Sequence, residues 1–470
     1  MRVRTRDTAG FVLVVGTFVA LVVHGTADHQ DTHLPVVADA GGAATSPATA
    51  PTLAFVDFNV VQMDGQDVLR RQVVIVRDGF VSRIGPVGVV DVPTAATVVQ
   101  GDGSAYLVPG LVDAHVHLED AREDLLPLFL ASGVTTVFNL RGDERHLELR
   151  ARSRDPEFVG PTIFTSGPFV HDGAVRSADE ARRTVEAQAR AGYDFVKIHG
   201  DLSAESYAAL MTTARDAGIP VVGHAPRNLP FSAVLEHGQV GVVHAEELIY
   251  TGLHSLDPEQ AKSIATEMVR AGTWLTPTLS TFANIAEQWA SPEGLAARLA
   301  EPEVRYLPRS LRQTWERSEV YVGRPARERA RIQDMYAFHG PLVRAMDLAG
   351  VRLLTGTDAP LPGMVPGASL HDELEALEAA GVTAKRVLAA ATSNAGRFIQ
   401  ENVDSTAVFG TILIGARADI VLVGGDPLND LGLLRRPLGV MVRGTWYERA
   451  DLDRMLALVS GDRLADEAPH

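Results

Sequence analysis

Eight short apolar runs recur along the middle of this chain, and their repetition limits the possible folds more than any other feature. Helical patterns separate several of them, such as residues 203–218, where Ser203 and Glu205 suit a helix start. Alternating strands and helices predict an α/β fold with a parallel sheet, and eight such units favour a closed (β/α)8 TIM barrel over an open sheet. The runs lie at 107–117, 133–140, 161–167, 194–200, 219–225, 240–246, 273–279 and 351–359.

Both ends of the folded part have β-strand composition. Residues 52–108 and 405–447 contain β-branched runs broken by Gly, Asp and Pro, and Asp78-Gly79 is a hairpin turn signal. We therefore expect one small β-sandwich domain formed by both chain ends, flanking a barrel over residues 109–404. A helix or tail is expected over 448–470.

The spacing between the seventh and eighth apolar runs is too long for one helix. Residues 284–345 are rich in Arg and Glu and predict a helical insertion. Such an insertion would cover the barrel mouth as a lid, form a dimer surface, or be a solvated decoration without a chemical role.

The N-terminus predicts export. Arg2, Arg4 and Arg6 precede the apolar run at 11–23, and small residues follow it, so residues 1–27 have the pattern of a secretory signal. The run is short for a membrane span, which needs about 20 residues, although an uncleaved membrane anchor is the alternative. Residues 28–51 have the composition of a flexible linker. We expect a secreted, cell-envelope or periplasm-like location.

Charge and composition narrow the partners and the chemistry. The 470-residue chain has a formal net charge of −16, which argues against nucleic acid because phosphate binding needs clustered Lys and Arg. It contains no Cys, so disulfides, thiolate metal sites and Cys nucleophiles are excluded. A small-molecule substrate is expected, with contact to a membrane only through the N-terminal anchor, and homo-oligomers stay possible.

Polar residues end several of the apolar runs. His115 and His117 share one face of a strand, because side chains two residues apart point the same way. Alone, the pair could be packed core histidines. His224, His244 and Asp358 end three further runs at the same place, where barrel enzymes carry their catalytic groups. One metal cluster explains them together, and imidazoles and a carboxylate suit Zn²⁺ or related ions.

Lys197 lies inside another of these apolar strands. An ammonium group would repel a divalent cation, but a neutral lysine amine can add CO₂ and become a carbamate able to bridge two metals. The alternative is a lysine that forms an ion pair with Asp358 or extends to the rim.

Several motifs together resemble the metal-dependent amidohydrolase superfamily, in the branch of imidazolonepropionase-like and prolidase-like enzymes. The likeness covers about residues 52–447, and its carriers are VPGLVDAHVHL, YDFVKIHG, VVGHAP, VVHAEEL, TPTL, TGTDAP, SLHDELEAL and GTILIGARADIVLV. The resemblance implies that His115 and His117 bind one metal and His224 and His244 a second. It also implies that Lys197 bridges them as the carboxylated side chain, and that Asp358 binds the first metal and handles protons.

The reaction implied by this resemblance is hydrolysis of an amide or peptide C–N bond in small substrates, such as dipeptides or N-acyl amino acids. Two divalent ions, zinc by default, would share a bridging hydroxide that attacks the carbonyl carbon. His244 and Asp358 would be the catalytic side chains, with His244 near the carbonyl oxygen. The alternatives are hydrolysis of a cyclic amide (imidazolone or lactam), a lactone or a phosphotriester at the same site, or a non-catalytic binding barrel.

Substrate contacts are expected from side chains near the same strand ends. His199 shares a face with Lys197, Tyr250 follows His244 on the next loop, and Arg141 could bind a substrate carboxylate. His371 begins the helix after the eighth run. For each of them, packing, capping or a surface ion pair is the simpler role. Further candidates are His171, His254, Glu246 and Glu247, of which the two glutamates could orient a histidine ligand.

Overall fold

The computed structural model describes residues 52–65, 68–118, 121–253, 255–291, 293–318 and 325–460. These residues belong to one compact unit. The predicted export signal at 1–27, the predicted linker at 28–51 and residues 461–470 of the predicted tail lie outside the described residues. No described helix combines the length and the apolar character needed to cross a membrane.

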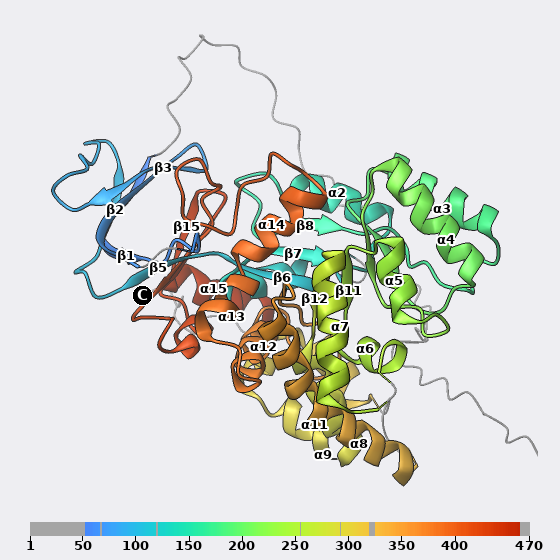
Figure 1. The fold of residues 1–470 in the computed structure, drawn as a ribbon. Coiled ribbons are helices and arrows are strands. Elements are labelled where there is room, and N and C mark those ends of the chain that lie inside the picture. Colours follow the sequence, from blue (N-terminus) through green and yellow to red (C-terminus); the bar gives the residue numbers. More distant parts are fainter. Residues whose placement is uncertain are drawn as a thin grey trace, which may run out of the picture. The chain divides into compact units, whose positions relative to one another are not determined.

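Seven of the eight predicted strands form two parallel sheets (Figure 1). One sheet has the order β6-β7-β8 and the other β12-β11-β10-β9. Their strands are β6 (Leu111–Val116), β7 (Val134–Asn139), β8 (Thr162–Thr165), β9 (Val196–Ile198), β10 (Val221–Gly223), β11 (Gly241–Val243) and β12 (Trp274–Thr276).

The eighth run, at 351–359, is not a regular strand, and the parallel strands do not close into one continuous sheet. Single parallel bridges link the neighbouring edges instead. Ser166 pairs with Phe195 between β8 and β9, Leu275 pairs with Leu353 beyond β12, and Val116 pairs with Ala359 beyond β6. A regular ladder needs extended backbone, whereas Asp358 has φ 54° and its N–H donates to the carbonyl of His115. The expected closed barrel is therefore seen only in part.

Helices connect the parallel strands and have clear start and stop signals. Ser177 and Ser203 cap α3 and α4 by accepting a backbone hydrogen bond, and both helices end at a glycine in the left-handed region, Gly192 and Gly218. The helices up to β12 are α1 (Leu126–Ala131), α2 (Glu144–Arg152), α3 (Ala178–Ala191), α4 (Ala204–Ala217), α5 (Phe231–His237), α6 (Glu246–Thr251) and α7 (Pro258–Ala271), with the 3-10 turn η2 (Glu123–Leu125).

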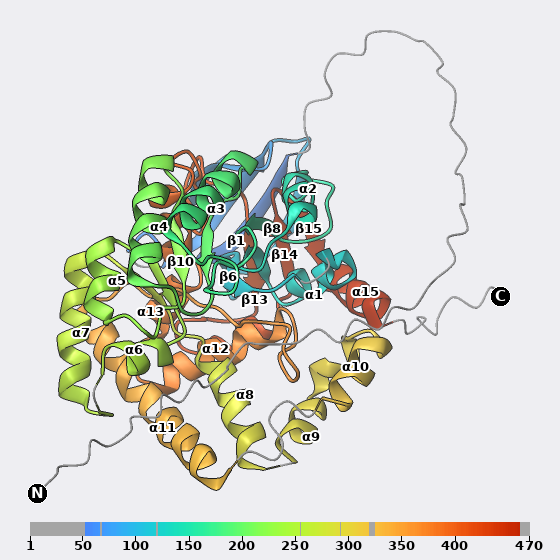
Figure 2. The ribbon, with the colours of Figure 1, turned by 90° about the vertical axis from the view of Figure 1, so that its right-hand side faces the viewer.

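Helices also occupy the predicted insertion between the seventh and eighth runs. Figures 1 and 2 show them at the end of the compact unit away from the β-sheet formed by the chain ends. They are α8 (Leu279–Ala290), α9 (Glu293–Leu299), η3 (Pro302–Tyr306), α10 (Arg309–Glu316) and α11 (Ala326–Ala349). Beyond them lie α12 (Ala368–Ala379), α13 (Ala384–Ala390), α14 (Ser393–Asn402), η4 (Leu431–Arg435) and α15 (Arg449–Ser460). Whether the insertion acts as a lid or a dimer surface stays a prediction.

An aromatic core lies between the two parallel sheets and α14. Phe398 of α14 packs at ring distances of 6.0 Å from Phe138, 6.2 Å from Phe195 and 5.6 Å from Trp274. Phe138 belongs to the three-stranded sheet and Trp274 to the four-stranded sheet, whereas Phe195 directly precedes β9 of the four-stranded sheet. Both sheets therefore share one packed interior.

Strands from both chain ends form a single eight-stranded sheet rather than the two packed sheets of a sandwich. Its order is β15-β14-β13-β5-β1-β2-β3, with β4 also paired to β1. The strands are β1 (Leu53–Val60), β2 (Leu69–Arg77), β3 (Phe80–Pro86), β4 (Thr97–Gln100), β5 (Tyr106–Pro109), β13 (Ile420–Val423), β14 (Gly439–Val442) and β15 (Thr445–Glu448).

A single sheet forms because different parts of β1 pair with two different strands. Residues 53–56 of β1 pair with β4, whereas Asn59 and Val60 pair with β5, and the backbone bends between them at Asp57, with φ 67°. The sheet therefore curls around its own apolar cluster, in which Phe55, Leu107 and Ile420 are fully buried. The contribution of both chain ends to one β structure is as predicted, but the two-sheet arrangement is not.

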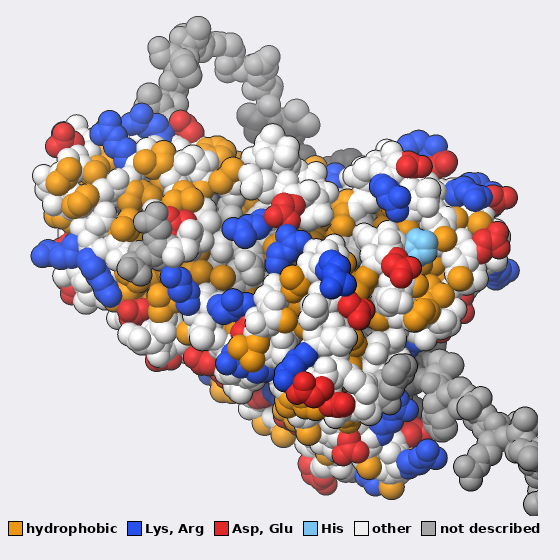
Figure 3. Space-filling model, viewed as in Figure 1, with side chains coloured by type: hydrophobic (Ala, Val, Ile, Leu, Met, Phe, Trp, Pro, Cys, Tyr) orange, Lys and Arg blue, Asp and Glu red, His pale blue; other side chains and the backbone are white. Residues whose placement is uncertain are grey.

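Charged side chains are mixed over the surface. Figure 3 shows Lys and Arg interspersed with Asp and Glu on the face that it presents. Such mixing is an ordinary feature of a soluble surface and gives this face no large field of a single sign.

Candidate active site

The six predicted ligand residues come from five segments of the chain and meet at one end of the parallel strands. His115 and Lys197 are fully buried, and His224 and His244 nearly so. This is where the carboxyl ends of parallel strands converge, which is the edge that carries catalytic groups in barrel enzymes. The segments are β6 for His115, the residue after β6 for His117, β9 for Lys197, the ends of β10 and β11 for His224 and His244, and the eighth run for Asp358.

The distances within the group are short. The Nε2 atoms of His115 and His117 each lie 3.2 Å from Oδ1 of Asp358. The Nζ atom of Lys197 lies 3.3 Å from Nε2 of His115. The ring of His244 is centred 4.8 Å from that of His115 and 4.9 Å from that of His224. The side chains therefore surround a common space.

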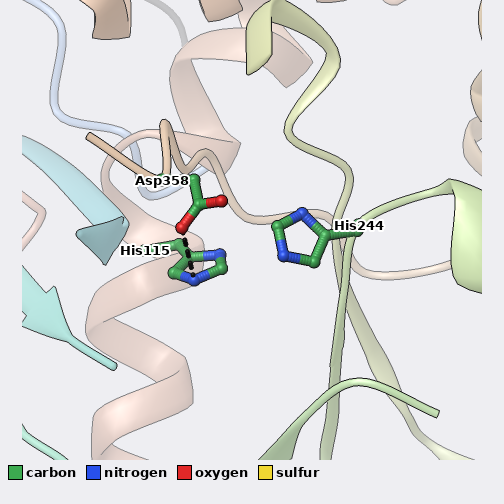
Figure 4. A group of neighbouring side chains, drawn as sticks. All are labelled: His115, His244 and Asp358. Carbon is green, nitrogen blue, oxygen red and sulfur yellow. Dashed lines mark ion pairs between the residues drawn. The ribbon is translucent and has the colours of Figure 1, made fainter. Parts of the chain in front are cut away.

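Three of these residues approach one another most closely. His115, His244 and Asp358 each offer a ligand atom, and these atoms lie within 4.8 Å of one another. Figure 4 shows the carboxylate of Asp358 directed at the His115 ring, with the His244 ring facing the pair. A divalent cation bound between them would have nitrogen ligands from the ends of β6 and β11 and an oxygen ligand from the eighth run.

A buried carboxylate that the sequence analysis missed holds two of the segments in place. Oδ1 of Asp113 accepts hydrogen bonds from the backbone N–H groups of His115 at 3.2 Å and Thr357 at 3.0 Å, and Oδ2 accepts one from the Thr357 hydroxyl at 2.6 Å. Asp113 thereby links β6 to the residue before Asp358. The signal was present, because Asp113 precedes His115 by two residues and so belongs to the same alternating series.

The second ring nitrogens of two histidines have partners in the chain. Nδ1 of His244 lies 2.8 Å from the Thr278 hydroxyl, and Nδ1 of His224 lies 3.2 Å from Oε1 of Glu247. Glu247 in turn accepts a hydrogen bond from Arg227 at 2.8 Å. Contacts of this kind fix the orientation of a ligating imidazole and leave Nε2 for the metal. The role of Glu247 was among the predicted alternatives, whereas Thr278 and Arg227 were missed.

Burial keeps the imidazoles of this group uncharged. It lowers the pKa of His115, His117, His224 and His244 well below 6.5, with neighbouring positive groups as the lesser cause. Burial also lowers the pKa of Lys197 to about 7, although the charges of Asp358 and Glu247 oppose that shift. The four histidines therefore present lone pairs, which is the form that binds cations.

The residues present fit a bound divalent cation. Within the described parts of the chain, the buried Nε2 atom of His117 lies 3.2 Å from Oδ1 of Asp358 but makes no hydrogen bond. A buried polar atom without a partner is costly, and in a cluster of neutral imidazoles and a carboxylate a metal ion would satisfy it. The donor set suits zinc or its neighbours in the first transition row.

Replacing Thr278 with Val is expected to weaken metal binding by about 10- to 100-fold, because His244 would lose the hydroxyl that orients it. The two side chains have the same shape, so the unfolding temperature should change little. Competition with a chromogenic chelator measures the affinity. Thr266→Val in α7, whose hydroxyl bonds only within its own helix, is the control. Unchanged affinity in Thr278→Val would show that the hydroxyl does not orient His244.

Three of the predicted substrate residues lie beside the cluster. His199 stacks on Phe169 at 4.3 Å and its ring lies 4.6 Å from that of His224. The guanidinium of Arg141 lies 5.6 Å from the centre of the Phe169 ring, and its charge acts on His117. Tyr250 lies under the guanidinium of Arg227, at 4.0 Å. Their contact with substrate stays a prediction.

Two other candidate histidines have their described contacts outside the cluster. His371 is buried in α12, and its Nε2 lies 2.9 Å from the carbonyl of Ser132 at the end of α1, so it packs between two helices. His171 lies in a loop, 3.9 Å from Asp172 and partly exposed. His254 lies outside the described residues.

Comparison with known proteins identifies the family. The sequence model of the Amidohydrolase family matches residues 106–447, which span the parallel strands, the metal-ligand candidates and the last β strands. The chain is an amidohydrolase. The resemblance to amidohydrolases inferred from the motifs is thereby confirmed, whereas the prolidase-like branch stays a prediction.

Relatives of this amidohydrolase include both sequences and solved structures. An uncharacterized protein of Mycobacterium tuberculosis is 26% identical over 386 residues, which cover 76% of this chain and 88% of that protein. The solved bottromycin amidohydrolase superposes with a TM-score of 0.68 and 26% identity over 87% of this chain and 90% of the other. The solved structure of a Xaa-Pro dipeptidase with bound methionine superposes with a TM-score of 0.65 and 18% identity. The match covers 84% of this chain and 100% of the other, which shows a shared fold. The family assignment supports an enzyme that hydrolyses carbon–nitrogen bonds.

Proposed function

We propose that this amidohydrolase uses divalent metal ions to hydrolyse amide or peptide bonds in small substrates, such as dipeptides or N-acyl amino acids. The observation that carries the proposal is the buried group in which four imidazoles, Lys197 and Asp358 face one another at the strand ends. The similarity to bottromycin amidohydrolase supports an amide as the bond that is cleaved. Export and oligomer formation stay predictions from the sequence.

The proposal also covers the architecture of the parallel strands, which would form a closed barrel. The two parallel sheets and residues 353–359 would act as one (β/α)8 barrel, because isolated bridges join every pair of neighbouring edges. The curved eight-stranded sheet would take the place of the sandwich that the sequence predicts.

Two cations are assigned to the cluster. His115, His117 and Asp358 would hold the first, His224 and His244 the second, and Lys197 would bridge them as its carbamate. Support for the carbamate comes from the full burial of Lys197 with its Nζ against the imidazole of His115, a position in which an ammonium group has little solvation. Bound cations would acidify a water molecule and polarise the substrate carbonyl.

Asp358 would move the proton during hydrolysis. Its carboxylate accepts a proton from the water as the oxygen attacks the carbonyl carbon, and then delivers that proton to the nitrogen as the C–N bond breaks. The products are a carboxylate and an amine. The hydrogen bond from the Asp358 N–H to the His115 carbonyl and the Asp113 contacts hold this carboxylate beside the imidazoles throughout. Thr278 keeps His244 turned toward the same space.

Metal removal and reloading test the function. Protein stripped with a chelator is expected to lose hydrolysis of dipeptides and N-acyl amino acids. Reloading with zinc in the presence of bicarbonate should restore activity at about two ions per chain. Bicarbonate is included because the carbamate requires CO₂. Hydrolysis by fully stripped protein at the original rate would contradict the assignment. So would full activity in protein that binds no more than one ion per chain.

A further inference from the structure

A buried glutamate in α12 makes its hydrogen bonds to the start of α8. Glu373 is fully buried, and its Oε2 atom accepts a hydrogen bond from the backbone N–H of Ser280 at 2.7 Å. The same oxygen accepts a second bond from the Ser280 hydroxyl at 2.9 Å. Glu373 belongs to SLHDELEAL, the motif that also contains His371. The motif thus contributes a buried carboxyl group that the proposed reaction does not use.

The start of α8 lacks the usual side-chain cap. Its N-cap residue is Thr278, and an N-cap threonine ordinarily accepts a hydrogen bond from the N–H of the second or third helical residue. Among the described residues, the Thr278 side chain accepts no such bond, and its hydroxyl lies 2.8 Å from Nδ1 of His244 instead. Glu373 accepts the N–H of Ser280, which is the second residue of the helix. The carboxyl group from α12 therefore replaces the cap and leaves the Thr278 hydroxyl for His244.

The backbone at Thr278 needs support from its neighbours. Thr278 has φ 52°, in the left-handed region that a β-branched residue rarely adopts. Such a conformation persists only where the surrounding contacts enforce it. The bonds from Ser280 to Glu373 fix the chain two residues after Thr278. The Thr281 hydroxyl also donates to the carbonyl of Thr357 at 2.5 Å, so the first turn of α8 is held by α12 and by the eighth run.

We propose that Glu373 is a positioning residue that holds Thr278 in the conformation from which its hydroxyl orients His244. The inference rests on the proposed binding of metal by His244 and extends it to a residue that touches neither metal nor substrate. Without the Glu373 oxygen, Thr278 would leave its left-handed conformation and cap α8 itself. Its hydroxyl would then no longer reach Nδ1 of His244, and the imidazole would lose the partner that keeps Nε2 available to a cation.

Two substitutions of Glu373 separate hydrogen bonding from charge. Within the described residues, Oε1 of Glu373 has no hydrogen-bond partner, so a single oxygen serves Ser280. Glu373→Gln removes the charge but keeps one carbonyl oxygen at the same reach, and its metal affinity should stay within about twofold of the wild type. Glu373→Asp keeps the charge but is too short to reach Ser280, and its affinity should fall by about tenfold or more.

Competition with a chromogenic chelator measures the affinity of both variants. Equal affinity in the two, or affinity kept in Glu373→Asp and lost in Glu373→Gln, would overturn the assignment. Glu375→Gln is the control for loss of charge from the same helix. Glu375 is exposed on α12 and pairs with Arg435 at 2.9 Å, so this variant should bind metal as the wild type does.

A double-mutant cycle tests the route through Thr278. Thr278→Val already removes the hydroxyl, so adding Glu373→Asp to it should lower metal affinity by less than about twofold further. A residue that only stabilised the fold would add its full effect of about tenfold in either background. Full additivity of the two substitutions would therefore refute a positioning role.

A smaller change covers the case in which Glu373→Asp does not fold. Ser280→Ala removes one of the two hydrogen bonds to Oε2 and keeps the backbone N–H. It should weaken metal binding in the same direction by about threefold. Wild-type affinity in folded Ser280→Ala would then count against the proposal.

The ring of His244 can also be followed in the absence of metal. NMR of stripped protein with nitrogen-labelled histidine shows which ring nitrogen carries the proton, and His244→Asn identifies the signal. Wild type and Glu373→Gln should have Nδ1 protonated, whereas Thr278→Val and Glu373→Asp should show a mixture of tautomers. Wild-type protein that binds no metal would remove the proposed function, but these spectra would still decide the inference. A His244 signal unchanged by Glu373→Asp refutes it.

Discussion

Replacing Asp358 with Asn is expected to abolish nearly all turnover while the protein stays folded. Asn cannot accept the proton from the attacking water or return it to the leaving nitrogen, so kcat should fall by a factor of about 10² to 10⁴. The backbone should tolerate the change, because Asp358 has φ 54° and Asn adopts this left-handed region readily. The measurement is kcat on whichever amide the wild-type enzyme hydrolyses fastest, with circular dichroism to verify the fold.

The matched control for Asp358→Asn is Asp57→Asn. Asp57 also has a left-handed backbone, with φ 67°, but it lies in the eight-stranded sheet and pairs with Arg71. This variant should keep its full kcat. Turnover in Asp358→Asn close to that of the wild type, with metal bound, would show that another group carries the proton.

Replacing Lys197 with Met is expected to remove the proposed carbamate bridge between the two proposed cations. Met fills about the same volume in this fully buried position, so the fold should survive, but it can neither add CO₂ nor bind the ions. Bound metal should fall from about two ions per chain to one or fewer, and kcat/KM by a factor of about 10³. Elemental analysis of dialysed protein and steady-state kinetics measure the two effects.

A small carboxylate should partly replace the carbamate in a shorter variant. Lys197→Ala leaves space where Nζ lies in the wild type, 3.3 Å from His115, and added acetate or propionate can occupy it. Metal binding and activity in Lys197→Ala should therefore rise with the concentration of the acid, whereas Lys197→Met, with the space filled, should not respond. Two tightly bound ions in Lys197→Met would show that Lys197 is an ordinary buried lysine.

The sequence was most informative where a residue interrupts a periodic pattern. Apolar strands alternate in and out with a period of two, so a histidine or lysine within such a run must either be paired or serve a ligand. That reasoning located seven parallel strands and the six residues that the structure brings together. It also explains why Asp113 could have been found, since it occupies the same alternating face as His115.

Contacts between residues that are distant in sequence could not be predicted from this periodic pattern. The hydroxyl of Thr278 meets His244, and Arg227 meets Glu247, only because neighbouring strand ends converge in space. For the same reason, the sequence does not reveal which face of its helix His371 occupies. In the structure its Nε2 lies 2.9 Å from the Ser132 carbonyl, and its contact with substrate stays a prediction.

Backbone irregularities limited the prediction of the fold. The eighth run has the composition of a strand, but its left-handed residue, Asp358, interrupts the ladder and leaves single bridges. Composition likewise showed that both chain ends form β structure, but not that β1 would pair with β4 and β5 in turn and produce one curved sheet.

The pairing of β5 with β13 also sets an order of events during synthesis. Residues 106–109 pair on one side with β1, but their neighbours on the other side are residues 420–423, which leave the ribosome after every parallel strand and the helical insertion. Until then, one side of β5 exposes unpaired backbone groups, and contacts this distant in sequence form slowly. During most of translation, the nascent chain thus exposes the unpaired edge of β5. We therefore expect chaperones that cover unpaired strands to bind it.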